Sequence, residues 1–217
     1  MSELNYLDVS VKARYFSSGS LSDETKCIVL AFHGYGQLGS YFIRHFESLK
    51  NCFVIVPEGL HRFYLQGTEG RVGASWMTKE DRMVDIENQS SYINAIYTPI
   101  KNVKSDATRL IVLGFSQGVS TALRWMVNNN VKPDTFVAWA GSFPLDLDVE
   151  LVSETLKEVQ FIKVIGDKDP YFKDEQRALL QNWISSHSLN AEHLSFNGEH
   201  QMNKKLLEGI IANTFSK

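Results

Sequence analysis

The chain has 217 residues, an apolar fraction of 43% and a formal net charge of −3, values typical of one globular domain with a sizeable core. So small a charge argues against a nucleic-acid-binding surface and a polybasic membrane patch. No apolar run approaches the roughly 18 residues of a membrane span, and the N-terminus lacks the pattern of a signal peptide, so we expect a single domain over residues 1–217 in the cytoplasm.

The first part of the chain alternates strand and helix patterns. Residues 8–16 alternate polar and apolar side chains with a period of two, which predicts an edge strand. Residues 26–34 and 52–59 are continuous apolar runs that end at glycine, and they predict strands buried on both faces. The helical spacing of residues 39–51 predicts a helix between them.

Both cysteines lie in these buried runs, Cys27 in the first and Cys52 in the second. Free cysteines are commonly buried, and disulfides are rare in the cytoplasm. The sequence therefore predicts two buried free thiols.

The rest of the chain continues the alternation. Residues 80–103 predict a long amphipathic helix that Pro99 should kink or shorten. The other predicted strands are 109–114, 134–141, 160–167 and 191–198, and the other predicted helices are 117–130, 171–188 and 203–215.

This order predicts an α/β fold with a mostly parallel central sheet, helices on both of its faces and no large cap domain. In such sheets the functional site lies at the carboxyl ends of the strands.

A serine between two glycines follows the predicted strand at 109–114. The run Gly114-Phe115-Ser116-Gln117-Gly118 is a G-x-S-x-G motif between a strand and a helix, as a nucleophile elbow requires. The glycines keep atoms clear of the sharp turn, and the helix N-terminus favours negative charge nearby. A helix N-cap, the alternative, would not explain both glycines, so Ser116 is the predicted nucleophile.

A serine hydroxyl needs a base, and the elbow fold has the chain order serine, acid, histidine. His187 lies in a helix pattern and His193 in a strand pattern, whereas His200 follows the last predicted strand in a glycine-containing loop. A loop there can extend over the strand ends, so His200 is the predicted base, with an ordinary loop histidine as the alternative.

Asp167 and Asp169 are the candidates for the acid, because both lie at the end of the predicted strand 160–167. Residues two apart point the same way in an extended chain, so spacing alone does not choose between them. Pro170 holds the Asp169 backbone extended and leaves its carboxylate free to accept from His200. Asp169 is therefore preferred, and Asp167 is expected to accept backbone N–H groups of the tight turn.

A glycine-rich turn, HGYG, follows the predicted strand at 26–34. Acyl transfer needs an oxyanion hole, and its donors are predicted to be the backbone N–H groups of Gln117 and of Tyr35 in this turn. An ordinary glycine turn is the alternative.

The ordered segments FHGYGQ, VIVPEG, GFSQG, AGSFP, GDKDP and GEHQM resemble the phospholipase/carboxylesterase family of α/β hydrolases, which includes the acyl-protein thioesterases. The resemblance extends from about Lys26 to the C-terminus and implies a serine hydrolase of the α/β-hydrolase fold. The residues that it implies are Ser116, Asp169 and His200 as the triad, the Tyr35 and Gln117 amides as the oxyanion hole, and Ser142, Phe143 and Pro144 near the pocket.

Three features depart from the family pattern. Val119 stands where the family usually has a glycine, Glu199 precedes His200, and residues 60–77 are not a close match. The last segment carries three glycines and the aromatic residues Phe63, Tyr64 and Trp76. Its place at the strand ends predicts a short lid or an acyl-pocket wall with Trp76 as an apolar surface, and a solvated loop anchored by Trp76 is the alternative.

The sequence has no H-E-x-x-H zinc motif, no paired C-x-x-C and no Walker loop, so neither a metal nor a cofactor is expected. The motifs together predict a carboxylesterase or thioesterase that acts on a small-molecule substrate and binds no nucleic acid. A non-catalytic ligand-binding member of the fold is one alternative, and a dienelactone hydrolase or peptidase is another. The oligomeric state stays open.

Overall fold

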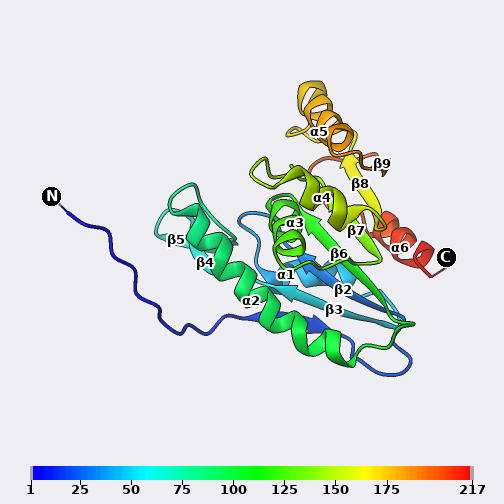
Figure 1. Ribbon diagram of the computed structural model, residues 1–217, viewed down its shortest axis with the longest axis horizontal. Coiled ribbons are helices and arrows are strands. Elements are labelled where there is room, and N and C mark those ends of the chain that lie inside the picture. The colour runs from blue at the N-terminus through cyan, green and yellow to red at the C-terminus, as the bar shows by residue number, and fades with distance from the viewer. Residues whose placement is uncertain (1, 216–217) are drawn as a thin grey trace.

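The computed structural model describes residues 2–215 and is built around a seven-stranded sheet (Figure 1). Each strand pairs in parallel with its neighbours, except that β1 is antiparallel to β3. This confirms the predicted mostly parallel α/β sheet. In sheet order the strands are β1 (Tyr15–Ser18), β3 (Cys52–Pro57), β2 (Cys27–Phe32), β6 (Arg109–Phe115), β7 (Thr135–Trp139), β8 (Gln160–Gly166) and β9 (Ala191–Phe196).

Helices cover both faces of this sheet, as predicted (Figure 1). One face carries α2 (Arg82–Val103), α3 (Gln117–Asn128) and α4 (Val149–Leu156), with α5 (Asp174–Ser186) beyond β8. The opposite face carries α1 (Gly39–Phe42), the 3-10 helix η1 (Ile43–Phe46) and α6 (Lys204–Asn213).

The apolar runs form one continuous core around the central strands. Every residue of β2 is buried, and so are all residues of β6 after Arg109. Strands covered by helices on both faces have no solvent side, which explains why these runs are continuous rather than alternating. Among residues 2–215, no helix combines the length and apolar character that crossing a membrane requires.

Three predicted elements differ from the structure. The edge strand at 8–16 is limited to β1, because Tyr15 pairs with Pro57, the last residue of β3, and residues before Tyr15 have no strand beside them. Pro99 does not shorten the helix, since it lies inside α2, which continues to Val103. The helix predicted at 39–51 is only α1 followed by η1.

Residues 60–77 form a hairpin rather than an irregular loop. It consists of β4 (His61–Gln66) and β5 (Glu69–Ser75), which pair antiparallel. Gly67 and Gly70 have positive φ values of 76° and 83°, which glycine adopts without strain and which the tight reversal requires. The hairpin follows the carboxyl end of β3, and a bridge between Gln37 and Ala74 attaches it to the turn after β2.

The prediction of two free thiols is wrong, because Cys27 and Cys52 form a disulfide. The cause is the register of the sheet, which sets Cys27 of β2 directly opposite Cys52 of β3 with their Cα atoms 4.8 Å apart. Both side chains are buried, so the bridge is enclosed within the core.

Candidate active site

Ser116 occupies a sharp turn between β6 and α3. Its backbone has φ 53° and ψ −119°, a combination that non-glycine residues rarely adopt. The backbone N–H of Ser116 donates to the Trp139 carbonyl of the neighbouring strand (2.9 Å), which holds the turn against the sheet. The strand–turn–helix geometry therefore agrees with the elbow that the motif predicts.

The two motif glycines are required by close packing around this turn. A Cβ atom on Gly118 would overlap the Phe32 carbonyl oxygen at the end of β2. A Cβ atom on Gly114 would lie within 2.6 Å of the Gly118 oxygen across the turn. The glycines thus let the start of α3 pack directly against the sheet.

The structure brings Ser116, His200 and Asp169 together from three separate parts of the chain. His200 Nε2 lies 3.0 Å from Ser116 Oγ, and His200 Nδ1 lies 2.8 Å from Asp169 Oδ2. The Asp169 side chain is fully buried, whereas that of His200 is 21% exposed. The imidazole thus connects a buried carboxylate to a hydroxyl at the protein surface.

Asp167 and Asp169 follow β8 but have different partners. Asp169 Oδ1 accepts the Tyr171 backbone N–H (2.9 Å), which orients the carboxylate toward His200. Asp167 Oδ1 accepts the backbone N–H of Gly198 (2.9 Å) in the loop that carries His200. Asp167 was expected to bind its own turn, but it instead fastens the His200 loop, because that loop lies directly beside the end of β8.

The turn after β2 leaves one of its amides free. The Gly34 N–H donates to Gln37 Oε1 and the Gly36 N–H to the Ala74 carbonyl, both at 2.8 Å. Within residues 2–215, the Tyr35 N–H has no such acceptor, and the N–H of Gln117, the first residue of α3, has no partner within its helix. Both residues line the hollow above Ser116, as an oxyanion hole requires.

The glycines at 34, 36 and 39 also have the spacing of a dinucleotide-binding fingerprint. Glu58, a buried carboxylate at the end of β3, accepts the Gly39 N–H at the start of α1 (2.9 Å). The carboxylate occupies the place where a pyrophosphate would bind, and its negative charge would repel one. The turn is therefore not arranged to hold a dinucleotide.

The hollow above Ser116 has a volume of about 420 Å³. Its walls come from the turns that follow β2, β6, β7, β8 and β9, as expected for a site at the carboxyl ends of the strands. The lining residues are Tyr35, Ser116, Gln117, Ser120, Ala140, Gly141, Ser142, Tyr171, Phe172 and His200.

The two residues predicted to contact substrate lie outside this lining. Trp76 is 0% exposed; its ring stacks on His33 and its Nε1–H donates to the His33 carbonyl (2.8 Å). It therefore offers no apolar surface, because the hairpin turns its side chain into the core. Phe143 packs against Trp183 and borders a second hollow of about 390 Å³, which shares Ser120 with the first.

Two supporting residues have no signal in the sequence. His33 is fully buried; its Nε2 accepts the Gly59 N–H (2.9 Å) and its Nδ1–H donates to the Gly34 carbonyl (2.8 Å). Burial lowers the pKa of His33 to about 4, so its ring is neutral near pH 7.

The Gln117 side chain joins the elbow to the end of the hairpin. Its Oε1 accepts the backbone N–H of Trp76, and its Nε2 donates to the Met77 carbonyl.

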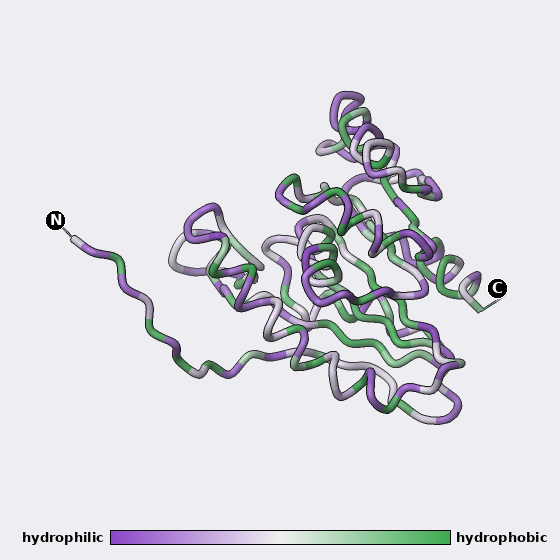
Figure 2. The backbone as a smooth tube through the Cα atoms, in the orientation of Figure 1, coloured by the Kyte–Doolittle hydropathy of each residue, from purple (hydrophilic) through white to green (hydrophobic). Residues whose placement is uncertain are grey.

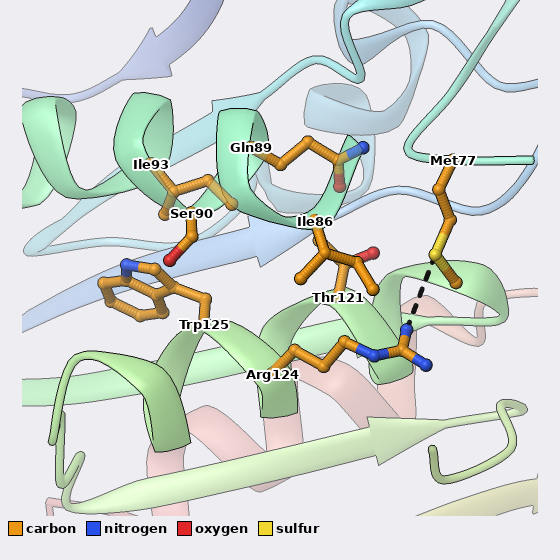
Figure 3. A pocket seen from close by; sticks show the side chains of 8 residues that line it. All are labelled: Met77, Ile86, Gln89, Ser90, Ile93, Thr121, Arg124 and Trp125. Carbon is orange, nitrogen blue, oxygen red and sulfur yellow. Dashed lines mark hydrogen bonds between the residues drawn. The ribbon is translucent and has the colours of Figure 1, made fainter. Parts of the chain in front are cut away.

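A smaller cavity lies between α2 and α3, away from Ser116 (Figure 3). Its volume of about 10 Å³ is close to that of one water molecule. Gln89 Nε2 and Trp125 Nε1 are buried in this region without a hydrogen-bond partner. The cavity holds none of the residues predicted to act in catalysis.

Comparison with known proteins agrees with this fold. The sequence profile of the phospholipase/carboxylesterase family matches residues 18–214, while no curated protein matches the chain. Acyl-protein thioesterase 2 of Zea mays has a similar structure, with a TM-score of 0.68 and 16% identity over 94% of this chain and 100% of that chain. The esterase PE8 gives 0.68 and 18% over the same shares, and a Bacillus cereus carboxylesterase gives 0.67 and 14% over 94% of each chain.

Proposed function

Because the chain belongs to the phospholipase/carboxylesterase family of α/β hydrolases, we propose that it cleaves carboxylic ester or thioester bonds through an acyl-enzyme intermediate. The observation that carries the proposal is the continuous contact from Asp169 through His200 to Ser116, with separations of 2.8 and 3.0 Å. A non-catalytic ligand-binding member of the fold would have no need for this arrangement.

In the first half-reaction His200 is the base. Its Nε2 takes the Ser116 proton as Oγ attacks the acyl carbon, and it then gives that proton to the leaving alcohol or thiol. Asp169 accepts the Nδ1–H and stabilises the imidazolium that forms between these steps. The rings of Tyr171 and Phe115, with centroids 4.7 and 5.0 Å from that of the imidazole, flank it and restrict its rotation.

The negative oxygen of the tetrahedral intermediate is held by the backbone N–H groups of Tyr35 and Gln117. Their amides require no reorientation, because the elbow fixes one and the bonds of Gly34 and Gly36 fix the other. Water then attacks the acyl-enzyme with His200 again as base, and the acid is released.

The acyl chain is proposed to lie between the hairpin and α1. This cleft has a volume of about 410 Å³ and begins at Gly36, next to the proposed oxyanion hole. Its walls combine the apolar residues Leu38, Phe42, Leu65 and Val72 with the polar residues Gln37, His45 and Arg71. The hairpin therefore acts as a pocket wall, with Trp76 supporting it from the core. Phe143, beside Ser120, is proposed to contact the other end of the substrate.

The test combines labelling with kinetics. The wild-type protein should react with a fluorophosphonate probe and hydrolyse p-nitrophenyl esters, measured from acetyl to palmitoyl. Ser116→Ala should abolish labelling and lower kcat on the order of 10⁴- to 10⁶-fold with an unchanged circular dichroism spectrum. Near wild-type esterase activity in this variant would refute the nucleophile.

A further inference from the structure

The segment before β1 has the residue pattern of a strand. From residue 7 to residue 15 every odd position is apolar, occupied by Leu7, Val9, Val11, Ala13 and Tyr15, and the even positions between them are polar. This period-two pattern is typical of a strand with one apolar face. Yet residues 2–14 form no regular secondary structure.

Nothing within the described chain covers this apolar face. Leu7 is 86% exposed, and Val9 and Val11 are each 70% exposed. Among residues 2–215, the backbone of residues 7–13 has no hydrogen-bond partner elsewhere in the chain. Figure 1 shows the segment leaving the sheet as an open arm, and Figure 2 shows hydrophobic and hydrophilic residues alternating along it.

Both ends of the arm are nevertheless attached to the body. The Tyr6 hydroxyl donates to the Asp81 carboxylate at the start of α2 (2.8 Å). At the other end, the Arg14 side chain pairs with Glu58, and the Arg14 carbonyl accepts the Tyr92 hydroxyl. The seven residues between these anchors are thus held near one position, which reduces the entropy that pairing with a partner would cost.

We propose that residues 7–13 of two copies of this chain pair as antiparallel strands around a twofold axis at Ser10. Pairing would satisfy the free backbone groups and place the apolar side chains of both arms on one face. The facing residues would be Leu7 with Ala13, Asp8 with Lys12, Val9 with Val11, and Ser10 with Ser10.

The charges of the arm select both this partner and this register. Asp8 and Lys12 have no ion-pair partner among residues 2–215, and the pairing centred on Ser10 sets each opposite the other, twice by symmetry. A shift by two residues separates Asp8 from Lys12 and sets Asp8 opposite either Ser10 or Arg14, whose side chain is already paired with Glu58. A shift by one mixes the apolar and polar faces. The segment is therefore complementary to itself, as a twofold interface requires.

Charge reversal tests the pairing on the full-length protein. Light scattering after gel filtration should give twice the chain mass of 24.6 kDa for the wild type. Asp8→Lys and Lys12→Asp should each place like charges opposite each other and raise the dimer Kd on the order of tenfold or more. The double variant Asp8→Lys/Lys12→Asp should restore the wild-type Kd, and an equimolar mixture of the two single variants should form a heterodimer.

A cross-link tests the register. Ser10→Cys should give a disulfide-linked dimer on mild oxidation, whereas Asp8→Cys should not, because two copies of residue 8 lie on opposite sides of the axis. The native cysteines do not interfere, since Cys27 and Cys52 are already paired within the core. A monomeric wild type, single variants that dimerise normally, or equal cross-linking at positions 8 and 10 would each overturn the proposal.

Discussion

Asp167 and Asp169 have the same side chain two residues apart, and their contacts predict opposite results for the same substitution. Asp169→Asn should remove the charge that stabilises the His200 imidazolium and lower kcat on the order of 10⁴-fold in a folded protein. Asp167→Asn keeps an oxygen that accepts the Gly198 N–H, so activity should be nearly retained, with at most about 1 kcal/mol lost in the free energy of unfolding.

Hydrolysis of p-nitrophenyl acetate and urea unfolding of both variants measure these two effects. The reverse pattern would make Asp167 the acid and leave the remaining roles unchanged.

His33 predicts a pH dependence of stability. Its Nε2 accepts the Gly59 N–H. Protonation at Nε2 would place an N–H of the imidazole directly against the Gly59 N–H in the core, with no acceptor between them. The pKa of about 4 in the folded state lies below the ordinary value of 6.5, so the stability that the neutral ring contributes is complete above pH 6.5 and is lost as the pH falls toward 4. The difference between these two pKa values corresponds to about 3 kcal/mol in the free energy of unfolding.

The measurement is the free energy of unfolding of wild type and His33→Asn at pH 7 and pH 4.5. Asparagine does not titrate, so the advantage of the wild type should shrink by about 2.4 kcal/mol at the lower pH. A constant difference would mean that folding does not lower the pKa of His33.

The sequence indicated the position of the site better than the direction of its side chains. Ser116, Asp169 and His200 each follow a strand pattern, so they could be placed at one edge of the sheet. Trp76 was noticed as an aromatic residue at the same edge, but the pattern does not say that its ring turns inward onto His33. His33 and the Gln117 side chain act through tertiary hydrogen bonds, which no local pattern reports.

The position of the hairpin beside the cleft predicts a substrate preference. Leu65 of β4 is 40% exposed and lines the cleft beside α1. Leu65→Ala should lower kcat/KM more for long acyl esters than for acetyl esters, because each methylene that loses its contact is worth at most about 0.8 kcal/mol. The series from acetyl to palmitoyl esters measures this slope.

Trp76→Phe is the matched control in the same hairpin. It removes the hydrogen bond to the His33 carbonyl without altering the cleft wall, so any loss of activity should be the same for every chain length. A slope with chain length in this variant, or none in Leu65→Ala, would count against the hairpin as the acyl-pocket wall.

The elements that the sequence mispredicts share a physical cause. Periodicity reports which face of a segment is apolar, but a strand also needs a neighbour to pair with. Residues 26–34 and 109–114 have neighbours on both sides and form β2 and β6 as predicted. Residues 8–14 also have a clear strand pattern, with a period of two, but they extend beyond the end of β3. Within one chain they therefore have no strand to pair with.

The disulfide and the candidate active site lie at opposite ends of the same strands. Cys27 and Cys52 are the first residues of β2 and β3, whereas the proposed oxyanion turn and the hairpin follow the last residues of these strands. The bridge thus joins the two strands far from the proposed chemistry. Disulfides are rare in the cytoplasm, so the cytoplasmic location stays a prediction.

Removing the bridge should therefore cost stability and leave the chemistry unchanged. Cys27 and Cys52 are 25 residues apart, and closing a loop of that length in the unfolded chain corresponds to about 3.5 kcal/mol. A reductant should lower the free energy of unfolding of the wild type by about that amount and should have no effect on Cys27→Ala/Cys52→Ala. The kcat of folded protein should be equal in both, because the strand ends that hold Ser116 and the Tyr35 turn keep their positions in the sheet. Two free thiols titrated in the unreduced, unfolded wild type would contradict the bridge, and a lower kcat in the folded double variant would show that it also positions the active site.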